Sequence, residues 1–283
     1  MQNPHKILDS KTFDFSNSAV IKPPWEEPKN KEVFNKITKV VIDSRDRNRD
    51  SYPNPNYYVI EVENEIEEVT TGEVSLFDVP LARYMIHSFN NKFVVNSNTE
   101  YSIPEGNYDP TSLTSTLSTL VAPSSIMAAY DGIKDKISFA SLINQPFTLQ
   151  FSSNSLARIL GFASKDVIYN SGSTFDVTSP YRLNLSEDHY IIMYVDMMTI
   201  NNSINSTINQ STAIIGKGDI YLNMRNLTLP IKKTFNPPIA RLTKLRIRMT
   251  DYYGNPYDFQ NQDHRLEFMF ESRKQLSRYT SFV

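Results

Sequence analysis

The amino-acid sequence predicts an all-β protein, a β-sandwich of the jelly-roll type into which two short helices are inserted. Most of the chain consists of short segments that are rich in β-branched and aromatic residues and bounded by polar residues, as β-strands are. Leu245, Ile247 and Met249 alternate with polar side chains, which is typical of an antiparallel sheet with one solvated face. Only two segments have the apolar spacing of an amphipathic helix.

The predicted strands follow one another from residue 37 onward. Within the fourth strand segment, Asn90-Asn91 is expected to form a tight hairpin turn, because asparagine tolerates positive φ. The stretch DYYGNPYDF, between the last two strands, is expected to form a turn and an ordered loop. The strand segments are ITKVVIDS (37–44), YYVIEVEN (57–64), EVTTGEVSLFDVP (68–80), RYMIHSFNNKFVVN (83–96), KDKISFAS (134–141), FTLQFSS (147–153), HYIIMYVDMM (189–198), TAIIGKGDIYLNM (212–224), LTKLRIRMT (242–250) and HRLEFMF (264–270).

The first predicted helix covers residues 108–122, YDPTSLTSTLSTLVA. Asp109 is a suitable N-cap, because its carboxylate can accept hydrogen bonds from the first free backbone N–H groups. Pro110 then occupies the first helical position, where its missing N–H has no consequence. Leucine and valine follow at positions that share one helical face, so this face is expected to be buried.

The second predicted helix covers residues 153–162, SNSLARILGF. Either Ser153 or Asn154 can cap its start. The apolar residues that follow share one face, and Gly161 is expected to end the helix, because glycine adopts the left-handed conformation that helix ends favour.

The two ends of the chain differ from its middle, because residues 1–36 show no sustained helical or strand period. Pro23 and Pro24 restrict the backbone, and the indole of Trp25, the single tryptophan, offers a large apolar face. These three residues are candidates for anchoring an arm on a neighbouring subunit; a disordered segment without a function is the alternative. We predict three parts: an extended N-terminal arm (1–36), a jelly-roll β-sandwich (37–271) and a basic C-terminal tail (272–283).

Composition excludes several classes of function. The net charge is −2, so the chain as a whole offers no electrostatic basis for binding nucleic acid. Cysteine is absent, and the four histidines are far apart in the sequence and form no metal-binding motif. No phosphate-binding loop, dinucleotide-binding motif or nucleophile elbow is present. We therefore expect no metal, no cofactor and no catalytic residues. No segment predicts membrane insertion, and contact with a membrane surface is left open without support from the sequence.

Two patterns could nevertheless carry chemistry. Glu61, Glu63, Glu65 and Glu67 are of the residue type with which glycosidases act in carboxylate pairs. The solvated face of a strand explains their strict alternation with Val62, Asn64 and Ile66 without catalysis. A carbohydrate-active enzyme is therefore a minor alternative. The pair Asp263-His264 at the start of a strand could be part of a catalytic dyad, although a surface hydrogen bond explains it more simply.

The charged stretch IDSRDRNRDSYPNPNYYVIEV (42–62) places acidic and basic residues side by side before a polar turn. No histidine or nucleophile accompanies it, so we interpret it as a solvated corner of the sandwich and not as an active site. Asp43, Arg45, Asp46 and Arg47 are candidates for fixing this corner or for contacting a neighbouring subunit. The Pro-Asn-Pro-Asn sequence that follows is expected to stiffen the path into the next strand.

Three stretches of the chain together resemble capsid proteins of large nucleocytoplasmic DNA viruses and of virophages. The combination is more specific than any one stretch, because the order and spacing agree over most of residues 40–270. The resemblance implies a single jelly roll in an icosahedral shell, since a major capsid protein of these viruses has two jelly rolls and a longer chain. The stretches are DSRDR (43–47) with YPNPNY (52–57), YSIPEGNYDPTSLTSTLSTLV (101–121) with SNSLARILGF (153–162), and LTKLRIRMTDYYGNPYDFQNQDHRLEFMF (242–270).

The resemblance implies a non-enzymatic structural protein of the virion, assembled in the host cytoplasm. A minor capsid protein would contact the major capsid protein and other minor capsid proteins through its arm and tail, and would take part in symmetric self-assembly. The first alternative is a penton protein at the five-fold vertex. The second comes from another class: a receptor- or glycan-binding β-sandwich of a virion spike, which predicts a concave patch of aromatic residues.

Overall fold

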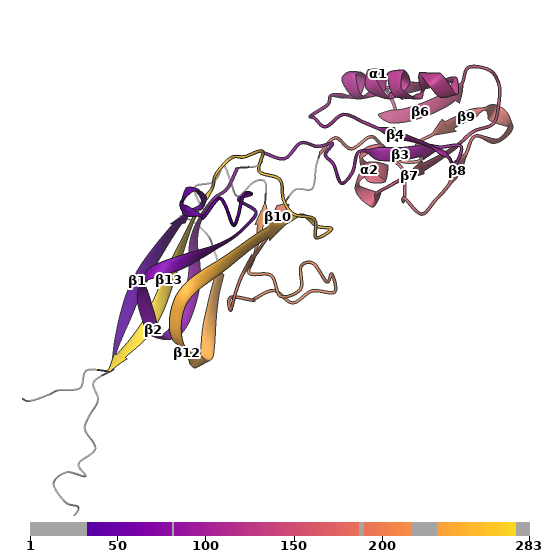
Figure 1. The fold of residues 1–283 in the computed structure, drawn as a ribbon. Coiled ribbons are helices and arrows are strands. Elements are labelled where there is room, and N and C mark those ends of the chain that lie inside the picture. Colours follow the sequence, from indigo (N-terminus) through magenta and orange to yellow (C-terminus); the bar gives the residue numbers. More distant parts are fainter. Residues whose placement is uncertain (1–32, 81, 187–189, 217–230, 276–283) are drawn as a thin grey trace, which may run out of the picture. The chain divides into compact units, whose positions relative to one another are not determined.

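The computed structural model describes residues 33–80, 82–186, 190–216 and 231–275 of the chain. Asn35–Lys274 forms one compact unit. Its largest sheet contains six antiparallel strands (Figure 1). Their order across the sheet is β1 (Val33–Asp43), β13 (Arg265–Gln275), β2 (Tyr57–Asp78), β12 (Ile231–Thr250), β10 (Tyr190–Val195) and β11 (Ala213–Gly216).

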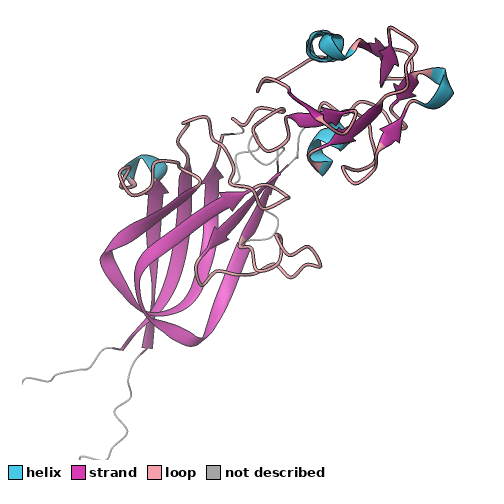
Figure 2. Cartoon of the chain, turned by 45° about the vertical axis from the view of Figure 1, so that its right-hand side comes forward, coloured by secondary structure: helices cyan, strands magenta, loops and turns pink. Residues whose placement is uncertain are grey.

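The two longest strands, β2 and β12, pass through both layers of a sandwich. The second half of β2 pairs with β13 and with the beginning of β12, whereas its first half pairs with the end of β12. Between these halves the pairing register shifts at Thr234/Ile239, and Glu68 adopts a φ of 52°. Such bulges bend a strand and increase its twist. The long strands curl accordingly, as Figure 2 shows.

This bending gives two layers with the strand order of a jelly roll. One layer contains β1, β13, the second half of β2 and the first part of β12; the other contains the first half of β2, the rest of β12, β10 and β11. Side chains from both layers, such as Phe268 and Ile247, belong to one hydrophobic core. The predicted fold class is confirmed: the described chain is all-β and jelly-roll-like, with two short helices inserted.

A second hydrophobic core is built from the residues between β2 and β10. It contains buried aromatic side chains, including Phe93, Phe139 and Phe162. The sequence did not predict a separate core, because the apolar residues of this region show the same alternation as those of the main sheet. The elements are a sheet in the order β4 (Thr99–Ser102), β3 (Lys92–Val95), β7 (Thr148–Phe151) and β8 (Tyr169–Asn170), a sheet in the order β5 (Ile126–Asp131), β6 (Lys136–Ser141) and β9 (Asp176–Thr178), and the helices α1 (Pro110–Val121) and α2 (Asn154–Ile159).

Both predicted helices are confirmed, with their caps. The Asp109 carboxylate accepts hydrogen bonds from the backbone N–H groups of Thr111 and Ser112 at 2.8 and 2.9 Å. The N-cap of α2 is Ser153, whose hydroxyl accepts a hydrogen bond from the backbone N–H of Leu156 at 3.1 Å. Neither described helix is long and apolar enough to cross a membrane.

The loop predicted after β12 is also confirmed, and Asp251 organises it. The Asp251 carboxylate accepts hydrogen bonds from the backbone N–H groups of Tyr253 and Asn255. It also accepts one from the Arg83 guanidinium at 2.9 Å, and both of these side chains are 1% exposed. The guanidinium carbon of Arg83 lies 4.9 Å from the ring centroid of Tyr257. A buried charge is thus paired and stacked, as its desolvation requires.

Two strand predictions were wrong in detail. The segments 57–64 and 68–80 form a single strand, β2, because the chain bends at Glu68 without leaving the sheet. The hairpin at Asn90-Asn91 does not form. Asn90 is instead buried, and its side chain accepts a hydrogen bond from the His87 N–H and donates one to the Met85 carbonyl, which holds a turn before β3. The predicted division into arm, sandwich and tail stays a prediction.

Candidate functional site

The charged stretch singled out in the sequence forms a corner between β1 and β2. A 3₁₀ turn, Ser44–Asp46, follows β1 directly, and Asp43 is its N-cap. The Asp43 carboxylate accepts a hydrogen bond from the backbone N–H of Arg45 at 2.9 Å and is bridged by the Arg45 guanidinium at 2.9 and 2.5 Å. These hydrogen bonds from Arg45 lower the pKa of Asp43 to about 2. Asp43 and Arg45 therefore satisfy each other at the surface.

Arg47 is the central residue of this corner, because its side chain is only 1% exposed and all its contacts are internal. The guanidinium donates hydrogen bonds to the backbone carbonyls of Ser44 at 2.6 Å, Tyr52 at 3.1 Å and Pro53 at 3.1 Å. It also bonds the Asp263 carboxylate at 2.7 Å. A planar guanidinium suits this role, since its donors point in fixed directions. Arg47 thus joins the turn after β1, the path into β2 and the residues before β13.

Ser44 and Asp263 complete the link between the ends of the jelly-roll sequence. The Ser44 hydroxyl donates to the Asp263 carboxylate at 2.8 Å, and the Ser44 backbone N–H donates to the His264 carbonyl at 2.9 Å. Burial alone would raise the pKa of Asp263, but the hydrogen bonds from Arg47 and Ser44 lower it below its ordinary value. We define Asp43, Ser44, Arg47, Asp263 and His264 as the polar corner.

His264 is the buried member of the polar corner, with 3% of its surface exposed. Its Nε2 lies 2.8 Å from the Tyr58 hydroxyl, whereas Nδ1 has no partner among the described residues. Burial lowers the pKa of His264 to about 4 and raises that of Tyr58. The suggested dyad is not formed, because the side chains of Asp263 and His264 bond to different partners. The imidazole is also buried, and does not make the surface hydrogen bond that was the simpler expectation.

The buried histidines predict acid sensitivity. Burial lowers the pKa of both His264 and His87 from 6.5 to about 4. In the unfolded chain these histidines bind a proton below about pH 6.5, whereas in the folded chain they bind one only near pH 4. The free energy of unfolding therefore falls as the pH is lowered from 6.5 to 4. Each histidine is expected to contribute on the order of 2–3 kcal/mol to this loss, since one pKa unit corresponds to about 1.4 kcal/mol.

Urea unfolding at pH 7, 6, 5 and 4 measures this effect. We expect the double variant His87→Gln/His264→Gln to lose much of the dependence of the free energy of unfolding on pH between 6.5 and 4. Asp43 contributes little within this window, because its pKa is about 2 in the folded chain and its ordinary value is 3.8. An unchanged pH slope in the double variant would assign the sensitivity to other groups.

The remaining candidates occupy different positions. Asp46 is the last residue of the turn; it is exposed and makes none of the polar contacts of the corner. Glu61, Glu63, Glu65 and Glu67 are all exposed on β2, and Glu65 pairs with Arg241 at 3.0 Å. Pro23, Pro24 and Trp25 lie outside the described residues. In the described part of the chain, no cluster of histidine and carboxylate side chains could hold a metal ion.

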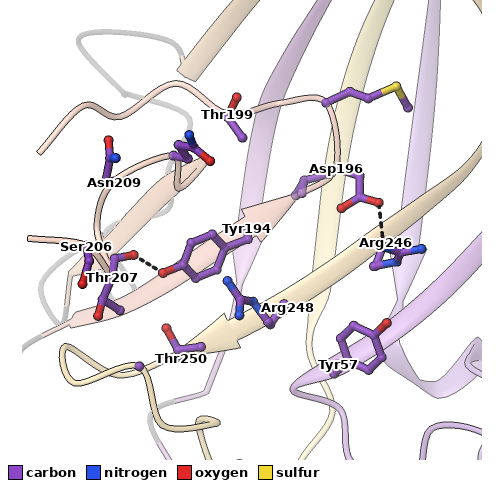
Figure 3. Close-up of a pocket in the computed structure, with 14 residues that line it drawn as sticks. Tyr57, Tyr194, Asp196, Thr199, Ser206, Thr207, Asn209, Arg246, Arg248 and Thr250 are labelled. Atoms are coloured by element: carbon purple, nitrogen blue, oxygen red, sulfur yellow. Dashed lines mark hydrogen bonds and ion pairs between the residues drawn. The ribbon is translucent and has the colours of Figure 1, made fainter.

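A pocket that the sequence analysis did not predict lies on the solvated face of β10 and β12 (Figure 3). It has a volume of about 650 Å³ and is lined by Tyr57 of β2, by residues of both strands and by the loop that follows β10. The Tyr194 hydroxyl donates to the Thr207 carbonyl and so fixes this loop over the strands. The lining residues come from four segments far apart in the sequence, so only the tertiary structure brings them together.

The pocket contains two arginines with different environments. Arg246 pairs with Asp196 at 3.4 Å. The guanidinium carbon of Arg248 lies 4.1 Å from the ring centroid of Tyr194, and Arg248 has no carboxylate partner among the described residues. A guanidinium stacked on an aromatic ring keeps its in-plane donors available for a ligand. With hydroxyl and amide groups around it, the pocket suits an anionic or hydroxyl-rich ligand.

Solved protein structures include chains that are similar to this one. No protein-family model matches the chain, and no curated protein matches it. One of the similar solved structures is the crystal structure of selenomethionine-labelled mavirus penton protein. The structural alignment covers 84% of this chain and 99% of the penton protein chain, with 12% sequence identity and a TM-score of 0.36. A TM-score this low does not support a conclusion about the function of this chain.

Proposed function

We propose that the protein is a non-enzymatic structural component of an icosahedral viral capsid. The observation that carries the proposal is the convergence of two stretches on which the resemblance to capsid proteins rests. Residues 43–57 and residues 242–270 are far apart in the sequence, yet Ser44 and Arg47 both bond Asp263, at 2.8 and 2.7 Å. The matching residues thus form one structural unit, as a family-specific corner would.

The use of charge at the polar corner supports a structural role. Arg47 directs its donors to three backbone carbonyls and one carboxylate, and Asp263 accepts from Ser44 as well. Groups satisfied in this way stiffen the connection between strands and are not available to a substrate. A jelly roll alone would not decide the function, because capsid proteins, lectins and enzymes share it.

The finer proposal is a minor capsid protein of the virion, assembled in the host cytoplasm, that contacts the major capsid protein and other minor capsid proteins. The described chain begins and ends at the same end of the sheet, since the Ser272 hydroxyl donates to the Lys36 carbonyl at 3.4 Å. The arm and the tail are proposed to engage the same neighbour. The proposed anchor of the arm remains Pro23, Pro24 and Trp25. Beside the polar corner, the exposed residues Arg45 and Asp46 are the proposed contacts to a neighbouring subunit.

Purified particles of the virus that encodes this chain test the proposal. We expect the protein to co-purify with intact particles at a fixed copy number, and symmetric reconstruction to show it in the shell. Density confined to the five-fold vertices would favour the penton alternative, in which five copies meet through heterologous contacts. Absence from particles, with the protein found only in infected-cell extract, would contradict a capsid role.

A receptor- or glycan-binding function is the second candidate, and the pocket around Arg248 favours it. Tyr57 and Tyr194 supply the concave aromatic surface that this alternative predicts, and Arg248 adds a cation. We expect an anionic glycan to bind, and Arg248→Ala to weaken that binding at least tenfold. Arg241→Ala is the matched control, because Arg241 is an exposed arginine of the same strand outside the pocket. A glycan array on which no ligand binds, or equal binding by both variants, would contradict this function.

A further inference from the structure

The pocket on the solvated face of β10 and β12 contains a buried hydroxyl group without a hydrogen-bond partner. Thr250 lines the pocket and is 3% exposed, and its hydroxyl bonds no other described residue. Buried hydroxyl groups in folded proteins are nearly always paired, because an unpaired one has given up its bonds to water without replacement. A ligand that accepts a hydrogen bond at this point would satisfy the group.

The alternation of β12 places Thr250 on the same face as Arg248. Ile247 and Met249 belong to the main core, so the residues that alternate with them face outward. Figure 3 shows Arg248 and Thr250 projecting from β12 on the side where Tyr194 lies. Successive residues on one face of a strand are about 7 Å apart, a distance that a group with two or three oxygen atoms can bridge between a long guanidinium side chain and a hydroxyl.

Two tyrosines hold Arg248 in place. In the register of the sheet, Arg248 lies between Tyr57 of β2 and Tyr194 of β10. Its guanidinium carbon is 4.1 Å from the ring centroid of Tyr194, whose hydroxyl donates to the Thr207 carbonyl. Tyr194 therefore orients both the guanidinium and the loop that covers the pocket. Groups that are already oriented lose less conformational entropy when a ligand binds.

The charges of the pocket favour an anion. Apart from tyrosines, its ionisable lining residues are Asp196, Arg246 and Arg248. Asp196 and Arg246 pair with each other at 3.4 Å, which leaves the charge of Arg248 uncompensated among the lining residues. The Lys233 ammonium adds positive charge at the rim, where it donates to the carbonyl of Thr199 at 2.8 Å. A guanidinium and a hydroxyl donor side by side suit an oxyanion such as a carboxylate or a sulfate.

The rest of the pocket suits a sugar ring. Tyr57 is 41% exposed, and its ring is steadied by an edge contact with Tyr52, at 5.6 Å between ring centroids. An exposed aromatic face offers a surface for the apolar face of a sugar. Ser206, Asn209 and Gln210 supply hydroxyl and amide groups for sugar hydroxyls, and a volume of about 650 Å³ has room for such a ligand.

We propose that Arg248 and Thr250 form an oxyanion subsite, which binds the carboxylate or sulfate group of an acidic sugar whose ring lies against Tyr57. Arg248 supplies the charge and a planar pair of donors, and the Thr250 hydroxyl donates one further hydrogen bond. This subsite distinguishes acidic sugars from neutral ones. The inference rests on the second candidate function and deepens it, because it names the chemical group that the pocket recognises and the residue that completes its recognition.

Titration of the full-length protein with pairs of acidic and neutral sugars tests the proposal. The carboxylate pair is 3′-sialyllactose and lactose, and the sulfate pair is N-acetylglucosamine-6-sulfate and N-acetylglucosamine. We expect the acidic member of at least one pair to bind at least tenfold more tightly than its neutral counterpart, and the pair that does so identifies the oxyanion. Equal binding of the acidic and neutral members in both pairs would overturn the proposal.

Thr250→Val tests the residue that completes the subsite. Valine has nearly the shape of threonine and lacks the hydroxyl, so binding of the acidic sugar should weaken at least tenfold while binding of the neutral sugar stays the same. The unfolding midpoint should not fall, because the hydroxyl has no protein partner to lose. Thr243→Val is the matched control, since Thr243 is an exposed threonine of β12 outside the pocket. Equal binding of the acidic sugar by Thr250→Val and the parent protein would overturn the subsite.

Inorganic sulfate separates the failure of this inference from the failure of the glycan-binding function. It is titrated at constant ionic strength while the Arg248 Nε–H resonance of the ¹⁵N-labelled protein is followed by NMR. We expect a saturable shift, with an affinity at least tenfold lower in Thr250→Val. This result together with a silent glycan array would keep the subsite and reject only the glycan function. A neutral glycan that binds equally to both proteins, with no saturable sulfate shift, would keep the glycan function and overturn the subsite.

Discussion

Replacing Arg47 by alanine is expected to lower the free energy of unfolding of the jelly roll by about 3 kcal/mol or more. The substitution leaves three backbone carbonyls and the Asp263 carboxylate without their donor, in a region where the arginine side chain is 1% exposed. Asp263 is 25% exposed and regains water, so the loss comes mainly from the carbonyls and from the cavity left by the side chain. Urea unfolding followed by circular dichroism measures the change.

Arg45→Ala is the matched control for Arg47→Ala. It removes the same charge two residues away, but the Arg45 side chain is 69% exposed and contacts only its neighbour Asp43. Its unfolding midpoint is therefore expected to stay close to that of the parent protein. Arg47→Lys should recover only part of the lost stability, because an ammonium group cannot reach all of the acceptors that the guanidinium fork reaches. Equal midpoints for Arg45→Ala and Arg47→Ala would show that the polar corner does not hold the strands together.

Replacing Gly161 by alanine is expected to destabilise the second core by roughly 3–5 kcal/mol, since it combines a left-handed backbone with a steric clash. Gly161 follows α2 with a φ of +79°, and a Cβ built there would lie 2.4 Å from the Tyr181 carbonyl oxygen and 2.8 Å from that of Arg182. Both obstacles are backbone atoms, and the Tyr181 N–H already bonds the Gly161 carbonyl at 2.9 Å. Neither segment can move away without breaking this contact.

Gly172→Ala separates the cost of the left-handed backbone from the cost of the steric clash. Gly172 also has a positive φ, of +57°, but no atom lies within 4 Å of its added Cβ. It should therefore show only the conformational term, about 1–2 kcal/mol. Thermal unfolding of both variants gives the comparison. Similar losses at the two positions would mean that the close approach at Gly161 relaxes easily, and would contradict the packing argument.

Local sequence signals determined the parts of the fold that depend on a few neighbouring residues. Asp109 and Pro110 marked the start of α1, and Gly161 marked the end of α2, because capping and positive φ are properties of the backbone within one turn. Strict alternation at residues 245–249 likewise identified an antiparallel strand with one buried face. The all-β class followed from such patterns.

The candidate site was predicted only in part. The charged stretch 42–62 was correctly interpreted as a corner, but its residues looked equivalent in the sequence. Arg45 turned out to be exposed and Arg47 buried, because Arg47 bonds Asp263 before β13 whereas Arg45 bonds its neighbour Asp43. Asp263 and Ser44 were not connected in the sequence analysis, since nothing local indicates that residues so far apart will be paired.

Sequence patterns alone were therefore enough to specify an all-β chain with two capped helices, a charged corner and a basic tail without acidic residues. The three-dimensional arrangement was needed to establish that β2 is one strand bent between two layers, that Arg47 joins both ends of the jelly roll, and that Arg248 lines an open pocket. The two kinds of information differ in range. Propensity, capping and alternation act between neighbours along the chain, whereas strand register and burial depend on which distant segments pair, and a shift of a single residue reverses which side chains are buried.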